Sequence, residues 1–240
     1  MSPIGGSGGK LRFSSYSRIP QVQTFRFATV NLFTRFVDPG HLARVLDEVQ
    51  PDLMVAVEMA PKAADVIADH FEHHHLVPDP HFMGWGVAGR YDMTADEDVS
   101  WLGRGGALRV QLPGTVLHLA AIHLYDPLFG NPIDLARKRR QQVEALLDWG
   151  DRLPAAEPQL LAGDFNATPI WKAYRRLAGR WPDLVSASPS GPRRTWGFPR
   201  GLRLLRIDHI LGTGLEATAA RVVRVRDSDH HMVVADLRLL

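Results

Sequence analysis

The sequence predicts an α/β protein in which strands of mixed direction form layered sheets covered by helices. Stretches with helical spacing of apolar residues alternate with short apolar runs that end in turn residues. A hairpin signal at Pro113–Gly114 adds antiparallel pairing to this pattern. No repeat or linker interrupts residues 24–240, so we expect one domain over 21–240 after a Gly/Ser-rich flexible tail at 1–20.

Composition excludes several classes of protein. The chain has 240 residues, 45% of them hydrophobic, which is enough to bury a substantial core. The absence of cysteine excludes disulfides, a thiolate nucleophile and a Cys-ligated zinc site. No apolar run approaches the roughly 20 residues that cross a bilayer, and the N-terminus lacks the apolar region of a signal peptide. We therefore expect a cytoplasmic monomer, although removal of a leader or anchor would leave the same sequence.

The net charge of +2 is unevenly distributed. Residues 61–130 carry four basic and nine acidic side chains, whereas 171–206 carry nine basic side chains and one acidic one. The second segment favours an anionic substrate such as a phosphodiester, of which nucleic acid is one kind. An Arg-rich solvated surface explains the same count.

The first elements are defined by periodicity. We expect a strand over 25–31, a helix over 41–49, a strand over 53–57 and a helix that opens at Pro61. Alternation along the first strand places Asn31 on the same face as Phe25 and Phe27. Glu58 follows the second strand directly.

Residues 73–104 show no clear period and are expected to be irregular. They include His73-His74-His75, which invites a metal site. Consecutive residues rarely point at one ion, so we favour a solvated loop.

A hairpin with strands over 105–112 and 115–123 is expected next, and His123 ends its second strand. A helix over 134–149 follows, with Leu135, Arg139, Gln142 and Leu146 on its inward stripe. Buried polar groups without partners are costly, so Arg139 and Gln142 should bind sheet ends near the site. The alternative is a rotated stripe on which both are wet.

The run 160–164 is predicted to be a buried strand that delivers Asp164 and then Asn166 at its end. Taken alone, Gly163-Asp164-Phe165-Asn166 reads equally well as a plain turn. The following helix carries Trp171, Tyr174 and Leu177, which we expect in the core. Strands are expected over 204–211, 218–225 and 232–239.

Polar residues with chemical potential gather at the predicted strand ends. They are Asn31, Glu58, His123, Asp164, Asn166, Asp208, Asp229 and His230. Carboxylates with an amide oxygen and no thiol select a hard cation, Mg²⁺ or Mn²⁺, over zinc. Mg²⁺ commonly binds one or two carboxylates together with a substrate phosphate, which indicates hydrolysis of a phosphate ester.

Eight short motifs occur in an order that resembles the endonuclease/exonuclease/phosphatase superfamily, the DNase I-like group of Mg²⁺-dependent enzymes. They are Ala28-Thr29-Val30-Asn31-Leu32, Val57-Glu58, Gly105-Gly106-Ala107-Leu108, Ile122-His123-Leu124, Gly163-Asp164-Phe165-Asn166, Thr195-Trp196, Ile207-Asp208-His209-Ile210 and Ser228-Asp229-His230. The resemblance implies a four-layer sandwich of two mixed β-sheets packed face to face and flanked by helices.

The resemblance also implies roles for the strand-end residues. Glu58 would be the principal metal ligand, with Asn31 and Asp229 completing or supporting the site. Asp164 would orient or deprotonate the attacking water, and Asn166 would hold that water and a phosphate oxygen. His230 would pair with Asp208 and face a phosphoryl oxygen, while His123 would contact the phosphate and assist the leaving oxygen.

Neighbouring residues leave choices. Asp208 and His209 face opposite ways on a strand, and we choose Asp208 for the site because His230 needs a carboxylate. His209 is then expected in the core or behind the site, and His231 is left as a neighbour of His230. Met232 replaces the usual proline of the family. Val57 stands where many members have glutamine, which puts a supporting amide beside Glu58 in doubt.

Rival functions are weighed by the residues that each would need. A calcineurin-type phosphoesterase would need an acidic residue at Ala167 and a later Gly-Asn-His, and neither is present. A catalytically inactive binding module is disfavoured because every expected polar position is filled. We predict a metal-dependent phosphodiesterase or nuclease, with a phospholipid or inositol-phosphate hydrolase as the runner-up.

Overall fold

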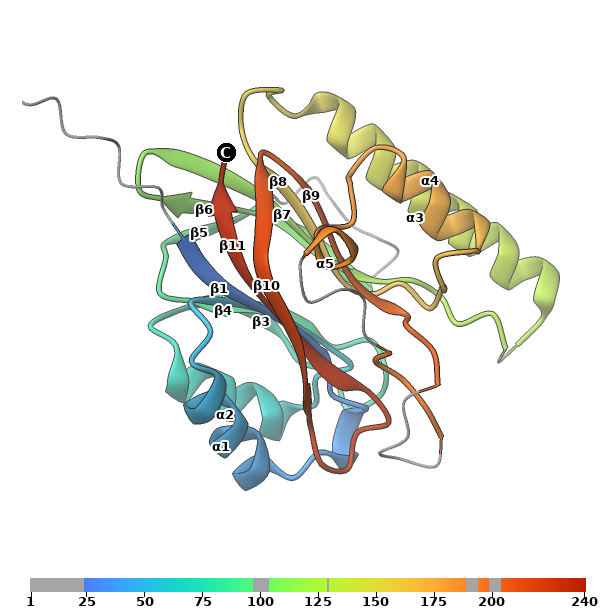
Figure 1. Ribbon diagram of the computed structural model, residues 1–240. Coiled ribbons are helices and arrows are strands. Elements are labelled where there is room, and N and C mark those ends of the chain that lie inside the picture. The colour runs from blue at the N-terminus through green and yellow to red at the C-terminus, as the bar shows by residue number, and fades with distance from the viewer. Residues whose placement is uncertain (1–23, 97–103, 129, 189–193, 199–203) are drawn as a thin grey trace, which may run out of the picture.

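Two β-sheets pack face to face between pairs of helices in the computed structural model, which describes residues 24–96, 104–128, 130–188, 194–198 and 204–240 (Figure 1). The expected tail lies outside these residues. The first half of the chain contains β1 (Thr24–Asn31), η1 (Thr34–Phe36), α1 (Pro39–Val49), β2 (Leu53–Val57), α2 (Pro61–His70), β3 (His73–Val77), β4 (Trp85–Gly89), β5 (Met93–Asp96) and β6 (Gly105–Leu112). The second half contains β7 (Thr115–His123), α3 (Pro132–Arg152), β8 (Gln159–Asp164), α4 (Lys172–Ala178), α5 (Leu184–Ala187), β9 (Asp208–Thr213), β10 (Leu215–Arg224) and β11 (His231–Leu239).

Both sheets are mixed. Sheet A has the order β10-β11-β1-β2-β4-β3, and sheet B has the order β5-β6-β7-β8-β9. The parallel pairs are β1 with β2 and β7 with β8, so each sheet has two adjacent strands that end at the same edge. The predicted four-layer α/β sandwich is therefore confirmed.

Three apolar layers hold the sandwich together. The middle layer lies between the sheets and takes Phe25 and Phe27 from β1. The outer layers lie between sheet A and α1 with α2, and between sheet B and α3 with α4 (Figure 1). Because alternate side chains of a strand face opposite ways, the face of β1 that carries Phe25 and Phe27 delivers Asn31 to the edge of the inter-sheet space.

Helix starts lie slightly earlier than periodicity predicts. Asp38 accepts a hydrogen bond from the His41 N–H at 2.7 Å, and Asn131 accepts from the first turn of α3. A proline follows each cap, where its fixed φ suits the first turn and its missing N–H is not needed. These caps extend α1 to Pro39 and α3 to Pro132.

The prediction of an irregular stretch over 73–104 is wrong. β3, β4 and β5 lie within it, and the histidine triplet forms part of edge strand β3 rather than a solvated loop. His73 lies 3.1 Å from Asp92, whereas the ring of His75 packs on Trp85. His74 Nδ1 binds the Phe71 carbonyl at 3.2 Å, so the three rings have different partners.

Two smaller expectations also need correction. The strand expected to begin at 204 begins at Asp208, because Leu205 instead forms an isolated bridge with Trp196. Tyr174 and Leu177 are buried as expected, but Trp171 precedes α4 and is 38% exposed.

Within the described ranges, no helix is both long and apolar enough to cross a membrane.

Candidate functional site

Seven of the eight predicted residues are brought into one network at the edge where β1, β2, β7 and β8 end and β9 begins. Asn31, His123, Asp164, Asp208, Asp229 and His230 are buried, and Glu58 joins them with its side chain 12% exposed. The eighth, Asn166, is half-buried beside Asp164. The sequence prediction of which residues meet is thus supported by geometry.

Sheet register places three of these residues in one row. His123 of β7 is the register partner of Asp164 of β8, and Asp164 is the partner of Asp208 of β9. Side chains at paired positions emerge on the same face of a sheet. The backbone ladder therefore sets the spacing of this row.

The backbone turns sharply where the carboxylates leave the strands. Gly163 has a φ of 139°, and a Cβ there would lie 1.9 Å from the Ile122 carbonyl oxygen. Glu58 and Asn166 adopt positive φ values of 50° and 46°. Such conformations cost a non-glycine residue about 1 kcal/mol or more, and they concentrate at functional sites.

Asn31 links the two sheets across the site. Its Nδ2 donates to Glu58 Oε1 at 3.0 Å and to Asp164 Oδ2 at 3.1 Å. Its Oδ1 accepts from the Phe33 N–H at 2.8 Å. In this arrangement the amide nitrogen faces the carboxylates, so a metal-ligating role for the Asn31 oxygen would require the amide to rotate.

Glu58 and Asp229 each offer a buried carboxylate oxygen that the protein does not satisfy. Glu58 Oε2 and Asp229 Oδ1 have no hydrogen-bond partner among the described residues. Burial, opposed by the Asn31 hydrogen bond, raises the pKa of Glu58 to about 7. A bound dication would satisfy such oxygens and favour the ionised carboxylate.

Ligand atoms converge in two overlapping groups around Asp164. Glu58, His123 and Asp164 form one group, and Asp164, Asp208 and His230 form the other, with the ligand atoms of each group lying within 4.8 Å of one another. The oxygen-rich donor set fits a hard cation.

His230 is held as an imidazolium by its surroundings. Its Nδ1 donates to the Asp208 carboxylate at 2.9 and 3.1 Å, and its Nε2 lies 3.7 Å from Asp164 Oδ2. Burial alone would lower the pKa of His230, but Asp208 and Asp164 outweigh it and raise that pKa to about 10. The Nε2–H therefore points a positive charge at Asp164.

His123 is held neutral instead. Its Nε2 lies 3.4 Å from Glu58 Oε1 and 4.0 Å from Asp164 Oδ2. Burial, and then the cations Arg104 and His230, keep the pKa of His123 well below its usual range. The site thus pairs one charged imidazole with one neutral imidazole.

Asp164 is buried between these groups. Burial is the main cause that raises its pKa to about 7, and His230 opposes the shift. The Asn166 N–H donates to Asp164 Oδ1 at 2.7 Å, and Asn166 Nδ2 donates to the Leu124 carbonyl at 2.9 Å. Asn166 thus ties the turn after β8 to the turn after β7.

Several supporting residues were not assigned a role from sequence. Trp196 Nε1 donates to Asp229 Oδ2 at 2.9 Å, and Ser228 Oγ joins the Asn31 carbonyl to the His230 N–H. Thr195 Oγ1 accepts from the Asp208 N–H at 3.2 Å. These three lie in the motifs noted above, whereas buried Arg104, beside Glu58, gave no sequence signal.

The polar stripe of α3 supports the site from behind, as predicted. Gln142 Nε2 donates to the His123 carbonyl at 3.1 Å, and Gln142 Oε1 accepts from the Tyr125 N–H at 2.9 Å. Arg139 donates to the Tyr125 carbonyl. Both stripe residues are buried and bind the turn after β7, so the rotated-stripe alternative is wrong.

A second polar cluster lies under the turn after β8. Asp183 accepts hydrogen bonds from Arg206 and Tyr174, and His209 Nδ1 lies 3.8 Å away. The His209 ring also binds the Ala167 carbonyl at 2.8 Å. His209 is fully buried, and its ring contacts Ala167 and Asp183, which are not among the predicted site residues.

A two-sheet sandwich with carboxylates and imidazoles at one edge defines a class of phosphoesterase folds, and the sequence assigns the chain to it. The model of the Endonuclease/Exonuclease/phosphatase family matches residues 28–230, and the chain belongs to this family. The predicted resemblance is confirmed.

Individual relatives are more distant. "Uncharacterized protein YbhP" of Escherichia coli is 28% identical over 137 residues, which cover 53% of this chain and 49% of that protein. The match thus spans about half the length of this curated relative.

Solved structures share the fold. An endonuclease/exonuclease/phosphatase from Beutenbergia cavernae has a TM-score of 0.68 at 22% identity, covering 90% of this chain and 72% of that one. A 3′ phosphatase, NExo, from Neisseria bound to a product DNA hairpin has a TM-score of 0.66 at 18% identity, covering 88% and 98%. TDP2 from Caenorhabditis elegans has a TM-score of 0.67 at 15% identity, covering 90% and 98%.

Proposed function

We propose that the chain is a divalent-metal-dependent phosphoesterase that hydrolyses a phosphodiester by in-line attack of water. The observation that carries this proposal is the pairing of unsatisfied buried oxygens on Glu58 and Asp229 with the imidazolium of His230. The first feature suits a hard cation, and the second suits a phosphoryl oxygen.

Glu58 and Asp229, supported by Asn31, would hold Mg²⁺ or Mn²⁺. When bound, the cation neutralises charge that develops on the phosphoryl oxygens. Glu58 Oε2 and Asp229 Oδ1, which have no partner among the described residues, are the oxygens available to bind it.

Asp164 accepts the proton of the attacking water in this proposal. Its pKa of about 7 in the absence of a metal suits proton transfer near neutral pH. Asn166, anchored to Leu124, orients the water.

The two imidazoles act on the phosphate. His230, held by Asp208, donates its Nε2–H to a non-bridging oxygen. As water attacks phosphorus, the ester P–O bond breaks, and neutral His123, at the other end of the row, would donate a hydrogen bond to the leaving oxygen, which then takes its proton from solvent.

The family supports this chemistry at a coarser level. Endonucleases, exonucleases and phosphatases all cleave phosphoester bonds, and the structural neighbour from Neisseria is described as a 3′ phosphatase bound to DNA. Its substrate belongs to that protein and is not carried over to this one.

Hydrolysis of bis(p-nitrophenyl) phosphate, with and without EDTA, tests the proposal. Asp164→Asn and His230→Ala should each abolish metal-dependent turnover without loss of fold by circular dichroism. Asp236→Asn, at the surface ion pair with Arg26, is the matched control and should retain activity. Wild-type turnover in either site variant would contradict the assignment. Inactivity of the wild type on this ester, plasmid DNA, RNA, sphingomyelin and inositol phosphates would favour a binding module.

A further inference from the structure

Exposed apolar side chains surround the candidate site. Eleven large apolar side chains are exposed in the described ranges. Six of them define a surface that we call the apolar rim: Phe82, Leu128, Ile133, Ile170, Trp171 and Phe198.

Chain connectivity and hydrogen bonds place the rim around the site. Leu128 and Ile133 follow His123, and Ile170 and Trp171 follow Asn166. The loop that carries Phe82 is bonded to the backbone after Glu58, through Met59 N to the Gly84 carbonyl at 3.1 Å.

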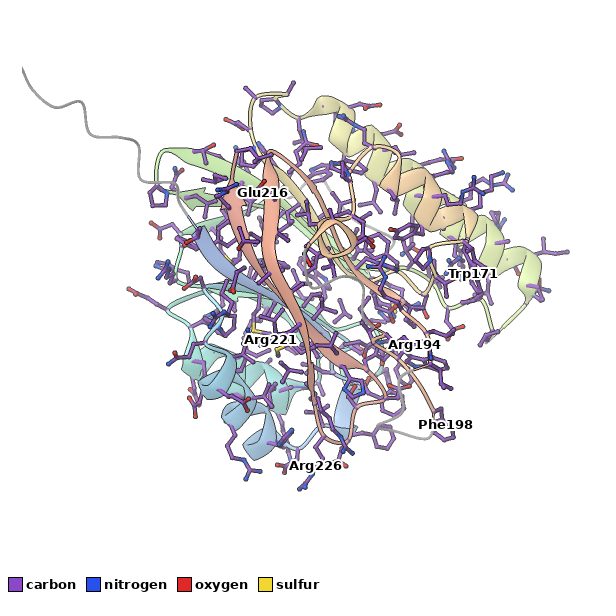
Figure 2. The ribbon with its side chains drawn as sticks, viewed as in Figure 1. Trp171, Arg194, Phe198, Glu216, Arg221 and Arg226 are labelled. Carbon is purple, nitrogen blue, oxygen red and sulfur yellow. The ribbon has the colours of Figure 1, made fainter. Side chains whose placement is uncertain are left out.

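The remaining rim residue, Phe198, belongs to the described segment 194–198. Phe198 lies two residues beyond Trp196, which binds Asp229. Figure 2 shows Trp171, Arg194 and Phe198 on the right of the molecule and Arg226 at its bottom.

The exposure of the rim is too large and too clustered for a surface that only meets water. Ile170 is 81% exposed, Ile133 80% and Leu128 71%. Single exposed apolar residues are common, but a group around a site marks a contact surface. Aliphatic side chains neither stack on bases nor bind phosphates, so nucleic acid does not account for these three residues.

Cations lie among the rim residues. Arg140, Lys172, Arg194 and Arg226 are exposed and make no ion pair within the part of the chain described. A groove of about 400 Å³ between α3 and α4 is lined by Trp171 together with Arg139, Arg140, Lys172 and Arg176. Of the groove cations, Arg176 pairs with Glu144 at 3.7 Å, and Asp134 of α3 is paired with Arg137 at 3.0 Å. Exposed aliphatic and aromatic side chains interspersed with Arg and Lys are the chemistry of a membrane-interface contact with anionic lipids.

We propose that the apolar rim docks on an anionic phospholipid surface and presents a lipid headgroup phosphodiester to the site. The aliphatic residues enter the headgroup and acyl boundary, and the unpaired cations contact lipid phosphates. Docking depends only on the rim, whereas hydrolysis of the lipid rests on the proposed function.

Vesicle sedimentation tests docking without catalysis. The full chain in EDTA is mixed with vesicles of phosphatidylcholine alone or of phosphatidylcholine with phosphatidylglycerol. Ile133→Ser with Ile170→Ser should weaken partition onto the anionic vesicles by roughly tenfold or more, because two apolar side chains no longer enter the interface.

Leu240→Ser is the matched control. Leu240 is 79% exposed, like the two rim residues, but lies at the opposite end of the sheets beside Gly214. Its variant should bind vesicles as the wild type does. Circular dichroism and thermal melting of all variants distinguish loss of docking from loss of the fold. If the double variant unfolds, Ile133→Ser and Ile170→Ser are tested singly in the same vesicle assay.

The outcomes separate the two proposals. Rim-dependent vesicle binding with an inactive enzyme would support docking and contradict the proposed function. Activity on the soluble ester without vesicle binding would overturn docking alone. Rim-dependent binding to an oligonucleotide instead of vesicles, or rim-dependent self-association by light scattering, would also overturn docking.

Discussion

The buried cluster around Asp183 provides a stringent test of how this fold is stabilised. Asp183→Asn removes a charge that faces Arg206, with both side chains 7% exposed, and leaves the guanidinium buried without its counter-ion. Breaking a buried pair from one side costs about 3–5 kcal/mol. A domain of this size loses roughly 2–4 °C of melting temperature per kcal/mol, so we expect a decrease of about 6–20 °C.

The pH dependence of stability gives the same cluster a second signature. Burial would raise the pKa of Asp183, but His209 and Arg206 outweigh it and hold that pKa well below its usual range. The contribution of Asp183 is therefore complete above the unfolded pKa of about 3.9 and is lost as pH falls through the lower folded value. Burial lowers the pKa of His209, so the contribution of His209 to stability falls below about pH 6.5, where the unfolded chain takes up the proton more readily.

Urea unfolding followed by tryptophan fluorescence, at a series of pH values, measures both effects. Asp151→Asn is the control, since Asp151 forms an exposed pair with Arg180 at 3.4 Å and should cost less than about 1 kcal/mol. A loss below about 1 kcal/mol in Asp183→Asn, or an acid limb identical to the wild type, would refute the reasoning.

Three further predictions concern the site. Gly163→Ala should destabilise the fold by about 3 kcal/mol or more, because its Cβ would lie 1.9 Å from the Ile122 carbonyl oxygen. An unchanged melting temperature would contradict the described turn. Gln142→Leu leaves the His123 carbonyl and the Tyr125 N–H without their partner, and should lower the free energy of unfolding by about 2–4 kcal/mol and also lower kcat. Urea unfolding and steady-state kinetics measure these two effects. Unchanged values would show that Gln142 does not support the turn after β7. Mn²⁺ should raise the melting temperature of the wild type and EDTA should reverse the increase. Glu58→Gln and Asp229→Asn should each lose this shift, Glu48→Gln should keep it, and a shift retained by either site variant would place the metal elsewhere.

Much of the site could be predicted because its residues follow strands with clear periodicity. The run 53–57 is apolar at every position and matches β2, so Glu58 is placed without any tertiary information. The run that ends at Asp164 behaves in the same way. β2 is parallel to β1, and β8 is parallel to β7, so each of these strand ends lies beside the end of its neighbour.

The failures have physical causes as well. β3 is an edge strand with alternating half-buried histidines, and no apolar period marks it. β4 is buried on both faces but contains Gly86 and Gly89, whose missing Cβ atoms allow close backbone approach and mimic a loop signal.

Side-chain direction at the site also lies beyond sequence reasoning. The family pattern indicates an Asn31 oxygen near the metal, yet the amide nitrogen binds Glu58 and Asp164. Arg104 is buried beside two distant segments: it donates to the Phe82 carbonyl, and its guanidinium carbon lies 4.8 Å from the centre of the Tyr125 ring. The orientation of the Asn31 amide and the burial of Arg104 both depend on contacts between segments that are distant in the sequence.

The row formed by His123, Asp164 and Asp208 makes strand alignment itself a condition for activity. A slip of β8 by one residue would retain a sheet but turn Asp164 to the opposite face. Such a species would share the size and circular dichroism of the native protein while being inert. Specific activity would then count the correctly aligned molecules in a refolded preparation, a quantity that spectroscopic measures of folding do not provide.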